Sequence, residues 1–330
     1  RRRHSFPTRR SSDLRAIAGQ YPPGSTYKLI VAAAALEEGV ITPETRINCS
    51  GSFDLGNRTY RCWRKNGHGP VNLHRALVES CDVYFYTVGK KLGVDRIARY
   101  ARKFGLGDVT GIELAHERKG LVPTRDWKQA RMKEPWQMGE TISISIGQGF
   151  NLTTPLQLAQ AYASLANGGT LWRPRLVQRI EAAEGGVVKE YLPEKKGDLG
   201  LSGKTVELLQ QALWGVVNEP GGTGYAARID GADVCGKTGT SQVVGLPQDE
   251  QARRRKKIAA FHKDHALFAC YAPARHPEIV VSVVAEHAGG GGAVAAPIAR
   301  RILKAYFDGK KKDRPVEVAV RRQTAGQAGN

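Results

Sequence analysis

Ser25 and Lys28 lie three positions apart and are the residues of this chain best suited to nucleophilic chemistry. Residues i and i+3 share one face of a helix, so the Lys28 amine can reach the Ser25 hydroxyl. A serine is a weak nucleophile until a base takes its proton, and a desolvated lysine can be that base. A helix-capping serine followed by a surface lysine would give the same string, so the chemical interpretation needs support from the rest of the chain.

A second hydroxyl and a carboxylate come from Ser80 and Asp82, which flank Cys81 at a predicted break between two helices. Side chains at such a break can lie beside another helix terminus that is distant in sequence. Ser80 and Asp82 are therefore candidate partners of the Lys28 amine.

A third group of polar residues falls in a predicted strand and consists of Lys237, Thr238, Gly239 and Thr240. A glycine inside a strand indicates close approach of another backbone or a ligand. A cation with flanking hydroxyls is suited to hold a carboxylate, while the strand backbone pairs with an extended peptide. The three groups together predict an acyl-transfer site with a peptide-binding strand.

Three thiols and one imidazole fall close together between the first two groups: Cys49, Cys62, His68 and Cys81. A set of three cysteines and one histidine can close a tetrahedral structural zinc site. The spacings are longer than in zinc fingers, and two other interpretations stay open. Cys49 and Cys62 could form a disulfide, or Cys81 could simply pack in the core.

The elements that must position these residues are mostly helical at first and extended later. Helices are predicted by apolar spacing and by Pro, Ser and Gly boundary signals at 29–36, 73–78, 83–92, 95–104, 155–167, 204–218 and 294–307. Region 107–153 reads mostly as loop. Three consecutive strands are predicted at 232–244, 266–272 and 279–287. This order predicts an α+β fold with an antiparallel sheet.

The composition of the 330 residues allows a substantial core, with 41% hydrophobic residues, and the formal net charge is +19. No apolar run is long enough to cross a membrane. The basic residues gather at the two ends and in a loop near 253–257, so attraction to an anionic polymer or membrane surface fits as well as nucleic-acid binding.

The two ends are expected to lie outside the folded domain. Residues 1–14 resemble the translation of a sequencing adapter and are excluded from the fold. Residues 309–330 are charged and rich in Ala, Gly and Gln, which is typical of a disordered tail. The domain is therefore expected to span 15–308.

In this order, the three polar groups resemble the motifs of the penicilloyl-serine transferases, the family of penicillin-binding proteins and serine β-lactamases. The resemblance covers about residues 16–306. It is most specific to the class B peptidoglycan transpeptidases of rod elongation, in the pieces Tyr21–Lys28, Gly67–Gly69, Trp127-Lys128 and Ile146–Gly149.

The resemblance implies a role for each candidate residue. Ser25 would attack a D-Ala-D-Ala carbonyl, with Lys28 as its base. Ser80 would relay a proton to the leaving group, and Asp82, where many relatives have Asn, would position Lys28. Binding of the substrate carboxylate falls to Lys237, Thr238 and Thr240. The backbone N–H groups of Ser25 and Thr240 would form the oxyanion hole.

The resemblance also implies a fold and a setting. We expect a transpeptidase fold, in which an antiparallel sheet covered by helices lies beside a helical subdomain. Two sheet strands that precede the nucleophile in this family are expected to be missing. The implied partners are stem peptides ending in D-Ala-D-Ala, β-lactam antibiotics and a membrane-embedded glycan polymerase with its elongation complex, with no nucleic acid. The implied location is the periplasmic face of the inner membrane. No cofactor is implied for the chemistry.

Three other functions compete. A serine β-lactamase would need a water-activating Glu-x-x-x-Asn loop, and the nearest segment, Glu113–Glu117, lacks the Asn. A non-catalytic β-lactam sensor would keep both Ser25 and Lys28. Residues 231–238 match the P-loop string of nucleotide-binding proteins, but that loop requires a helix to begin at Lys237-Thr238, where the sequence predicts a strand.

Overall fold

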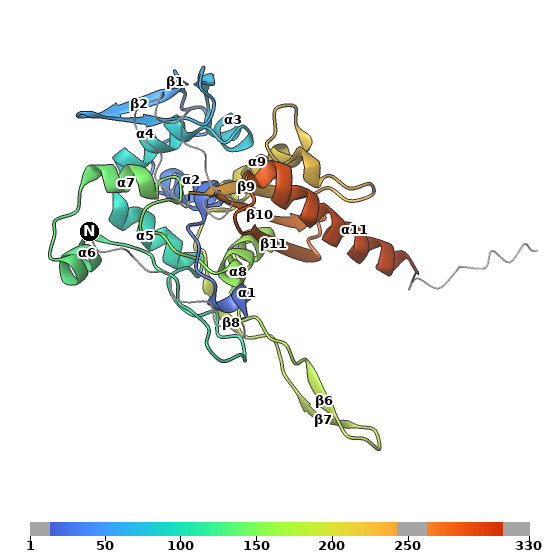
Figure 1. Ribbon diagram of the computed structural model, residues 1–330. Helices are drawn as coiled ribbons and strands as arrows, with labels where there is room; N and C mark the ends of the chain where they lie inside the picture. The colour runs from blue at the N-terminus through green and yellow to red at the C-terminus, as the bar shows by residue number, and fades with distance from the viewer. Residues whose placement is uncertain (1–13, 243–262, 313–330) are drawn as a thin grey trace, which may run out of the picture.

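The computed structural model describes residues 14–242 and 263–312, and its centre is a three-stranded antiparallel sheet (Figure 1). The strands are β9 (Cys235–Ser241), β10 (His265–Ala272) and β11 (Ile279–Ala285), in the order β11-β10-β9. All three lie within or close to the predicted ranges. Among the described residues β11 pairs only with β10, so the other edge of β11 has no strand beside it.

Helices cover both faces of this sheet. Along β10 the side chains alternate, and Leu267, Ala269 and Tyr271 join one apolar cluster while Ala266, Phe268 and Cys270 join another. The first cluster includes α8 (Pro155–Ala166), and the second includes α11 (Ala296–Lys312). Because both faces of β10 are buried, the strand reads as a nearly continuous apolar run in the sequence.

A helical subdomain lies beside the sheet. Its central helix is α2 (Lys28–Glu37), whose residues 28–35 are all buried. Around α2 lie α3 (Leu73–Val78), α4 (Asp82–Leu92), α5 (Val94–Lys103) and α9 (Gly203–Asn218). These helices match the predicted ranges within one or two residues. The α+β class and the combination of a sheet with a helical subdomain are confirmed.

Two helices occur in the region that was expected to be mostly loop. They are α6 (Arg125–Met132) and α7 (Met138–Ile144). Both are short, and α6 has only three apolar residues among eight, so neither shows a clear apolar period. Their starts are capped instead: the Thr124 hydroxyl accepts from the Trp127 N–H, and Gln137 and Glu140 form a capping box.

Short strands form three small sheets and a hairpin. β1 (Ile47–Cys49) pairs with β4 (Gly69–Val71), and β2 (Ser52–Leu55) pairs with β3 (Arg58–Arg61). β5 (Thr170–Trp172) pairs with β8 (Lys195–Asp198), while β6 (Arg179–Glu181) and β7 (Val187–Glu190) form a hairpin that projects from the body (Figure 1). The remaining elements are α1 (Arg15–Ala18), η1 (Gly24–Tyr27), η2 (Tyr225–Ala227) and η4 (Gly291–Ala295).

The last helix, α11, ends at Lys312 and so includes residues 309–312, which the sequence assigned to the charged tail. An ion pair between Lys310 and Glu278 ties this last turn to the body. The expected adapter segment and the rest of the expected tail lie almost wholly outside the described residues.

Within the described part of the chain, no helix combines the length and apolarity that a membrane span requires.

Candidate active site

Ser25 lies in a single 3-10 turn, η1, that leads directly into α2. The turn begins at Gly24, whose φ of +56° and close contact with the Thr240 carbonyl exclude a side chain. The Gly24 N–H donates to the Gly147 carbonyl at 2.9 Å. Ser25 is only partly buried and lies in the turn that leads into the buried helix α2. This confirms the predicted placement of the serine at a helix start.

Lys28 begins α2 and is fully buried. Its Nζ donates to Asp82 Oδ1 at 2.7 Å, to the Ser80 carbonyl at 2.9 Å and to Ser80 Oγ at 3.2 Å. Among the described residues these are the bonds of the amine, and none goes to the Ser25 hydroxyl. The structure therefore brings Lys28, Ser80 and Asp82 together, one helical turn from Ser25.

Ser80 lies between α3 and α4 with a left-handed φ of 55°. Such a conformation is uncommon for any residue other than glycine and is often found at functional sites. Asp82 is the first residue of α4, and its two carboxylate oxygens have different partners. Oδ1 accepts from Lys28, and Oδ2 accepts from the main-chain N–H of Trp63 at 2.9 Å.

The four residues of the third group all lie in β9, at an edge of the sheet. Lys237 is fully buried, and burial together with the nearby Lys28 ammonium lowers the pKa of Lys237 well below its ordinary value. Thr238 shares a hydrogen bond of 2.7 Å with Thr223. A Cβ on Gly239 would lie 2.9 Å from the Pro23 carbonyl, so this glycine allows β9 to touch the turn that holds Ser25. The predicted close approach is confirmed.

Thr240 is oriented by Gln148, a residue that the sequence placed in a distinctive segment but gave no role. Gln148 Nε2 donates to the Thr240 carbonyl at 2.8 Å, on the side away from β10. In an antiparallel strand the N–H and C=O of one residue point to the same side. The Thr240 N–H therefore also points away from β10, beside Gly24.

Because Lys237 and Thr238 lie in a strand, the P-loop interpretation of residues 231–238 is wrong. A P-loop lysine starts a helix whose N–H groups surround phosphate. Here the lysine is buried in the sheet edge and its Nζ donates to the Thr238 carbonyl at 3.2 Å. Because Lys237 and Thr238 have an extended backbone, no helix begins at these residues to bind a phosphate.

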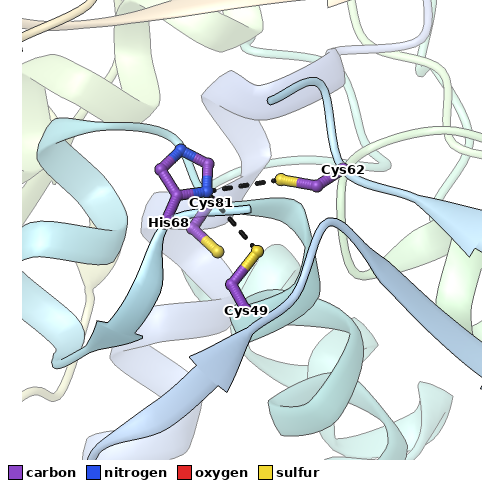
Figure 2. A group of neighbouring side chains, drawn as sticks. All are labelled: Cys49, Cys62, His68 and Cys81. Carbon is purple, nitrogen blue, oxygen red and sulfur yellow. Dashed lines mark hydrogen bonds between the residues drawn. The ribbon is translucent and has the colours of Figure 1, made fainter. Parts of the chain in front are cut away.

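The three cysteines and the histidine of the predicted metal set come together in the structure (Figure 2), and one of them, Cys81, lies between Ser80 and Asp82 in the chain. All four are buried, and their ligand atoms lie within 4.8 Å of one another. His68 Nδ1 lies 3.5 Å from both Cys49 Sγ and Cys62 Sγ. All three cysteines are free, so the structure does not contain a disulfide between Cys49 and Cys62.

The donor set fits zinc. Tetrahedral zinc with bonds of about 2.3 Å to sulfur and about 2.0 Å to nitrogen places these ligand atoms about 3.5 Å apart. A hydrogen bond with Cys81 lowers the pKa of Cys62, and the same bond with burial raises the pKa of Cys81. His68 Nε2 is buried without a hydrogen bond and lies 4.0 Å from Glu79. That carboxylate is placed to orient the imidazole.

Sequence reasoning missed two residues that contact the site, Trp63 and Gln148. Trp63 directly follows Cys62, and Gln148 lies between two glycines with left-handed backbones. The sequence signal for Trp63 was its position next to the predicted metal ligand Cys62. The signal for Gln148 was its position in a glycine-rich turn. The contacts themselves depend on segments that are far apart in the chain.

The buried lysine, the serine that begins a helix and the facing edge strand are arranged as in the penicillin-recognising fold. The family described as penicillin binding protein transpeptidase domain matches residues 2–304, and the chain belongs to this family. It is similar to the peptidoglycan D,D-transpeptidase MrdA of Haemophilus influenzae, with 42% identity over 299 residues, which are 89% of this chain and 45% of that protein. The chain thus spans about half the length of the curated relatives it matches.

Solved structures show the same relationship. The structure of Pseudomonas aeruginosa PBP2 in complex with WCK 5153 is 34% identical, with a TM-score of 0.78, and the match covers 93% of this chain and 65% of that one. PBP2 of Helicobacter pylori, solved in complex with MreC, is 30% identical with a TM-score of 0.76, over 90% of this chain and 51% of that one. The expected transpeptidase fold is confirmed.

Proposed function

We propose that this chain is the catalytic domain of a peptidoglycan D,D-transpeptidase that crosslinks stem peptides during cell elongation. The observation that carries the proposal is the buried Lys28 amine, which lies between Ser80 and Asp82 one turn after Ser25. The facing strand β9 supplies a second buried lysine, Lys237. Similarity to MrdA and PBP2 supports the same reaction.

In the structure Lys28 is the ammonium partner of Asp82, and it acts as a base only after giving up a proton. In the acylation step, Ser25 Oγ attacks the carbonyl carbon between the two terminal D-alanines, and the amine form of Lys28 takes the hydroxyl proton. The carbonyl oxygen becomes an oxyanion beside the N–H groups of Ser25 and Thr240, which would stabilise it. The carbon–nitrogen bond then breaks. Ser80 Oγ, 3.2 Å from Lys28 Nζ, relays the proton to the leaving D-alanine amine.

The edge position of β9 supports binding of an extended peptide. The Thr240 N–H points away from β10, toward the turn that holds Ser25, while the Thr240 carbonyl on the same side accepts from Gln148. Lys237 and the hydroxyls of Thr238 and Thr240 would bind the terminal carboxylate of the stem peptide. An amine of a neighbouring stem peptide then attacks the ester carbon and releases Ser25.

In a β-lactamase, segment Glu113–Glu117 would have to activate water, but its two carboxylates bind main-chain N–H groups of other loops. Glu117 accepts hydrogen bonds from the main-chain N–H groups of Thr110 and Gly111, at 2.7 Å and 3.0 Å. Glu113 accepts from the Leu176 N–H at 3.2 Å. Both carboxylates hold loops together, which favours transfer to an amine over hydrolysis.

We further propose that Cys49, Cys62, His68 and Cys81 hold a structural zinc ion. A closed set of four protein ligands leaves no position for water or substrate, so the ion would stabilise the loop rather than take part in the reaction. The ion would hold β1 and β4 against the start of α4, where Asp82 lies.

The setting proposed for the whole protein is the periplasmic face of the inner membrane, in an elongation complex with a membrane-embedded glycan polymerase. Helicobacter pylori PBP2 has been solved in complex with MreC, so one relative assembles with another protein. A further solved relative comes from work described as structural coordination of polymerization and crosslinking by a peptidoglycan synthase complex.

Mass spectrometry of the Ser25 peptide after exposure to a penicillin tests the proposed function. We expect a penicilloyl adduct on Ser25 that persists for many minutes, and no adduct on Ser25→Ala. Ser202→Ala is the matched control, because Ser202 also stands at a helix N-terminus but caps α9 away from the site. Release of hydrolysed penicillin within seconds would instead identify a β-lactamase. A stable adduct without crosslinking of a donor peptide to an amine acceptor would identify a sensor.

A further inference from the structure

Trp63 lies directly beside the catalytic groups, although none of the three catalytic motifs contains it. Its indole Nε1–H donates to two consecutive carbonyls, those of Glu79 at 3.0 Å and Ser80 at 3.1 Å. Its main-chain N–H donates to Asp82 Oδ2 at 2.9 Å. One exposed residue thus binds three residues of the segment that joins α3 to α4, namely Glu79, Ser80 and Asp82.

The turn that Trp63 contacts ends helix α3 in a Schellman motif. The Cys81 N–H donates to the Ala76 carbonyl at 2.9 Å, and the Ser80 N–H donates to the Leu77 carbonyl at 3.2 Å. The left-handed position of this motif is usually glycine, but here it is Ser80, with φ of 55°. A residue other than glycine holds this conformation only where surrounding contacts enforce it.

Trp63 and Lys28 bind the same two residues, Ser80 and Asp82. The Ser80 carbonyl accepts from both Lys28 Nζ and the indole N–H of Trp63. The Asp82 carboxylate likewise bridges Lys28 Nζ and the Trp63 main chain. Any rotation of the Ser80 peptide or of the Asp82 carboxylate would therefore move the partners of the Lys28 amine.

We propose that Trp63 is a positioning residue for acylation. Its indole N–H holds Ser80 in the left-handed conformation, which directs the Ser80 carbonyl and hydroxyl at Lys28. Its main-chain N–H holds the Asp82 carboxylate in line with the same amine. This inference rests on the proposed function, since it assigns Trp63 a role in the acylation of Ser25.

The location of Trp63 also connects the site with the cluster of Figure 2. Trp63 follows Cys62 in sequence, and its ring lies edge-on to His68 with 5.6 Å between ring centroids. The conformation of the loop that carries Cys62 therefore determines the position of the Trp63 indole. Trp63 therefore links the Cys62 loop to Ser80 through a hydrogen bond, in addition to the covalent link between Ser80 and Cys81.

Trp63→Phe tests the inference, because it keeps an aromatic ring and the main-chain N–H but removes the indole N–H. The measurement separates the acylation rate constant from the dissociation constant of the complex that precedes acylation, with a chromogenic β-lactam. We expect the rate constant to fall by about two- to tenfold, as for loss of one net hydrogen bond, and the dissociation constant to stay unchanged. Trp172→Phe, a half-exposed tryptophan on β5, is the matched control and should behave as wild type.

Three results would overturn the inference. Trp63→Phe could acylate at the wild-type rate, or it could bind the β-lactam more weakly with an unchanged rate constant, which would make the ring a ligand contact. A loss of zinc in proportion to the loss of rate would show that the ring acts through the cluster. Failure of the wild-type chain to form any Ser25 adduct would instead reject the proposed function, so the two failures are distinguishable.

Discussion

Lys28 Nζ lies 2.7 Å from Asp82 Oδ1, an ion pair between residues 54 positions apart in which the lysine side chain is fully buried. The same amine faces Lys237, a second buried lysine whose pKa is lowered by burial and by Lys28. The Asp82 carboxylate is thus the counter-charge of the buried Lys28 amine. An asparagine at this position would leave that amine without a negatively charged partner.

Asp82→Ala should destabilise the protein by about 3–5 kcal/mol, because it leaves the buried Lys28 ammonium without its counter-charge. Asp82→Asn should cost less, since an amide oxygen can still accept from Lys28. Urea unfolding of the two variants and the wild type measures the difference. An Asp82→Ala variant as stable as the wild type would show that the ion pair contributes nothing to folding.

Gly239→Ala should displace β9 from the nucleophile turn. A new Cβ would lie 2.9 Å from the Pro23 carbonyl oxygen and 3.0 Å from Thr26 Cγ2, so one of the two segments must shift. We expect a loss of about 1–3 kcal/mol in the free energy of unfolding and at least about a tenfold loss of acylation rate. Gly203→Ala is the control, since nothing lies within 4 Å of that position. Equal acylation by the two variants would argue against the close approach.

Cys49→Ser should release the zinc that we propose. We expect about one zinc per chain in the wild type and a small fraction of that in the variant, with a lower melting temperature. Cys270→Ala controls for the loss of a buried free cysteine outside the cluster. Elemental analysis of the purified proteins gives the result, and wild-type protein with only trace zinc would reject the metal site.

His265 should make the protein less stable in mild acid. Burial and the neighbouring His287 lower the pKa of His265 below 6.5, and the His287 N–H donates to His265 Nδ1 at 3.0 Å, which requires that nitrogen to be unprotonated. Below pH 6.5 the unfolded chain therefore binds more protons than the folded chain. The free energy of unfolding then falls as pH decreases through this window.

His265→Asn keeps a hydrogen-bond acceptor and does not titrate, so it should flatten this part of the stability curve. Denaturant unfolding at several pH values from 7.5 to about 5 compares it with the wild type. An unchanged slope in the variant would mean that other groups cause the acid sensitivity.

Much of the fold was predictable because its helices have strong local signals. Thr154 with Pro155 marks the start of α8, Ser202 marks that of α9, and the apolar run after Lys28 marks α2. Both α6 and α7 were missed, since a short helix stabilised by its caps has no apolar period to detect.

The P-loop interpretation of residues 231–238 is wrong although the residues match the motif. Pairing with β10 holds Lys237 in an extended backbone conformation, whereas a P-loop requires a helix to start there.

The amino-acid sequence alone determined which side chains could react: a serine and a lysine at helical spacing, a second serine with an aspartate, a lysine on a strand, and three thiols with an imidazole. Residue types and local spacing are enough for that. Only the tertiary structure decided which of them meet. The contacts of Lys28 with Asp82, of Trp63 with Ser80 and of Gln148 with Thr240 join segments 17 to 92 residues apart. Such contacts depend on how helices and strands pack, which no local pattern records.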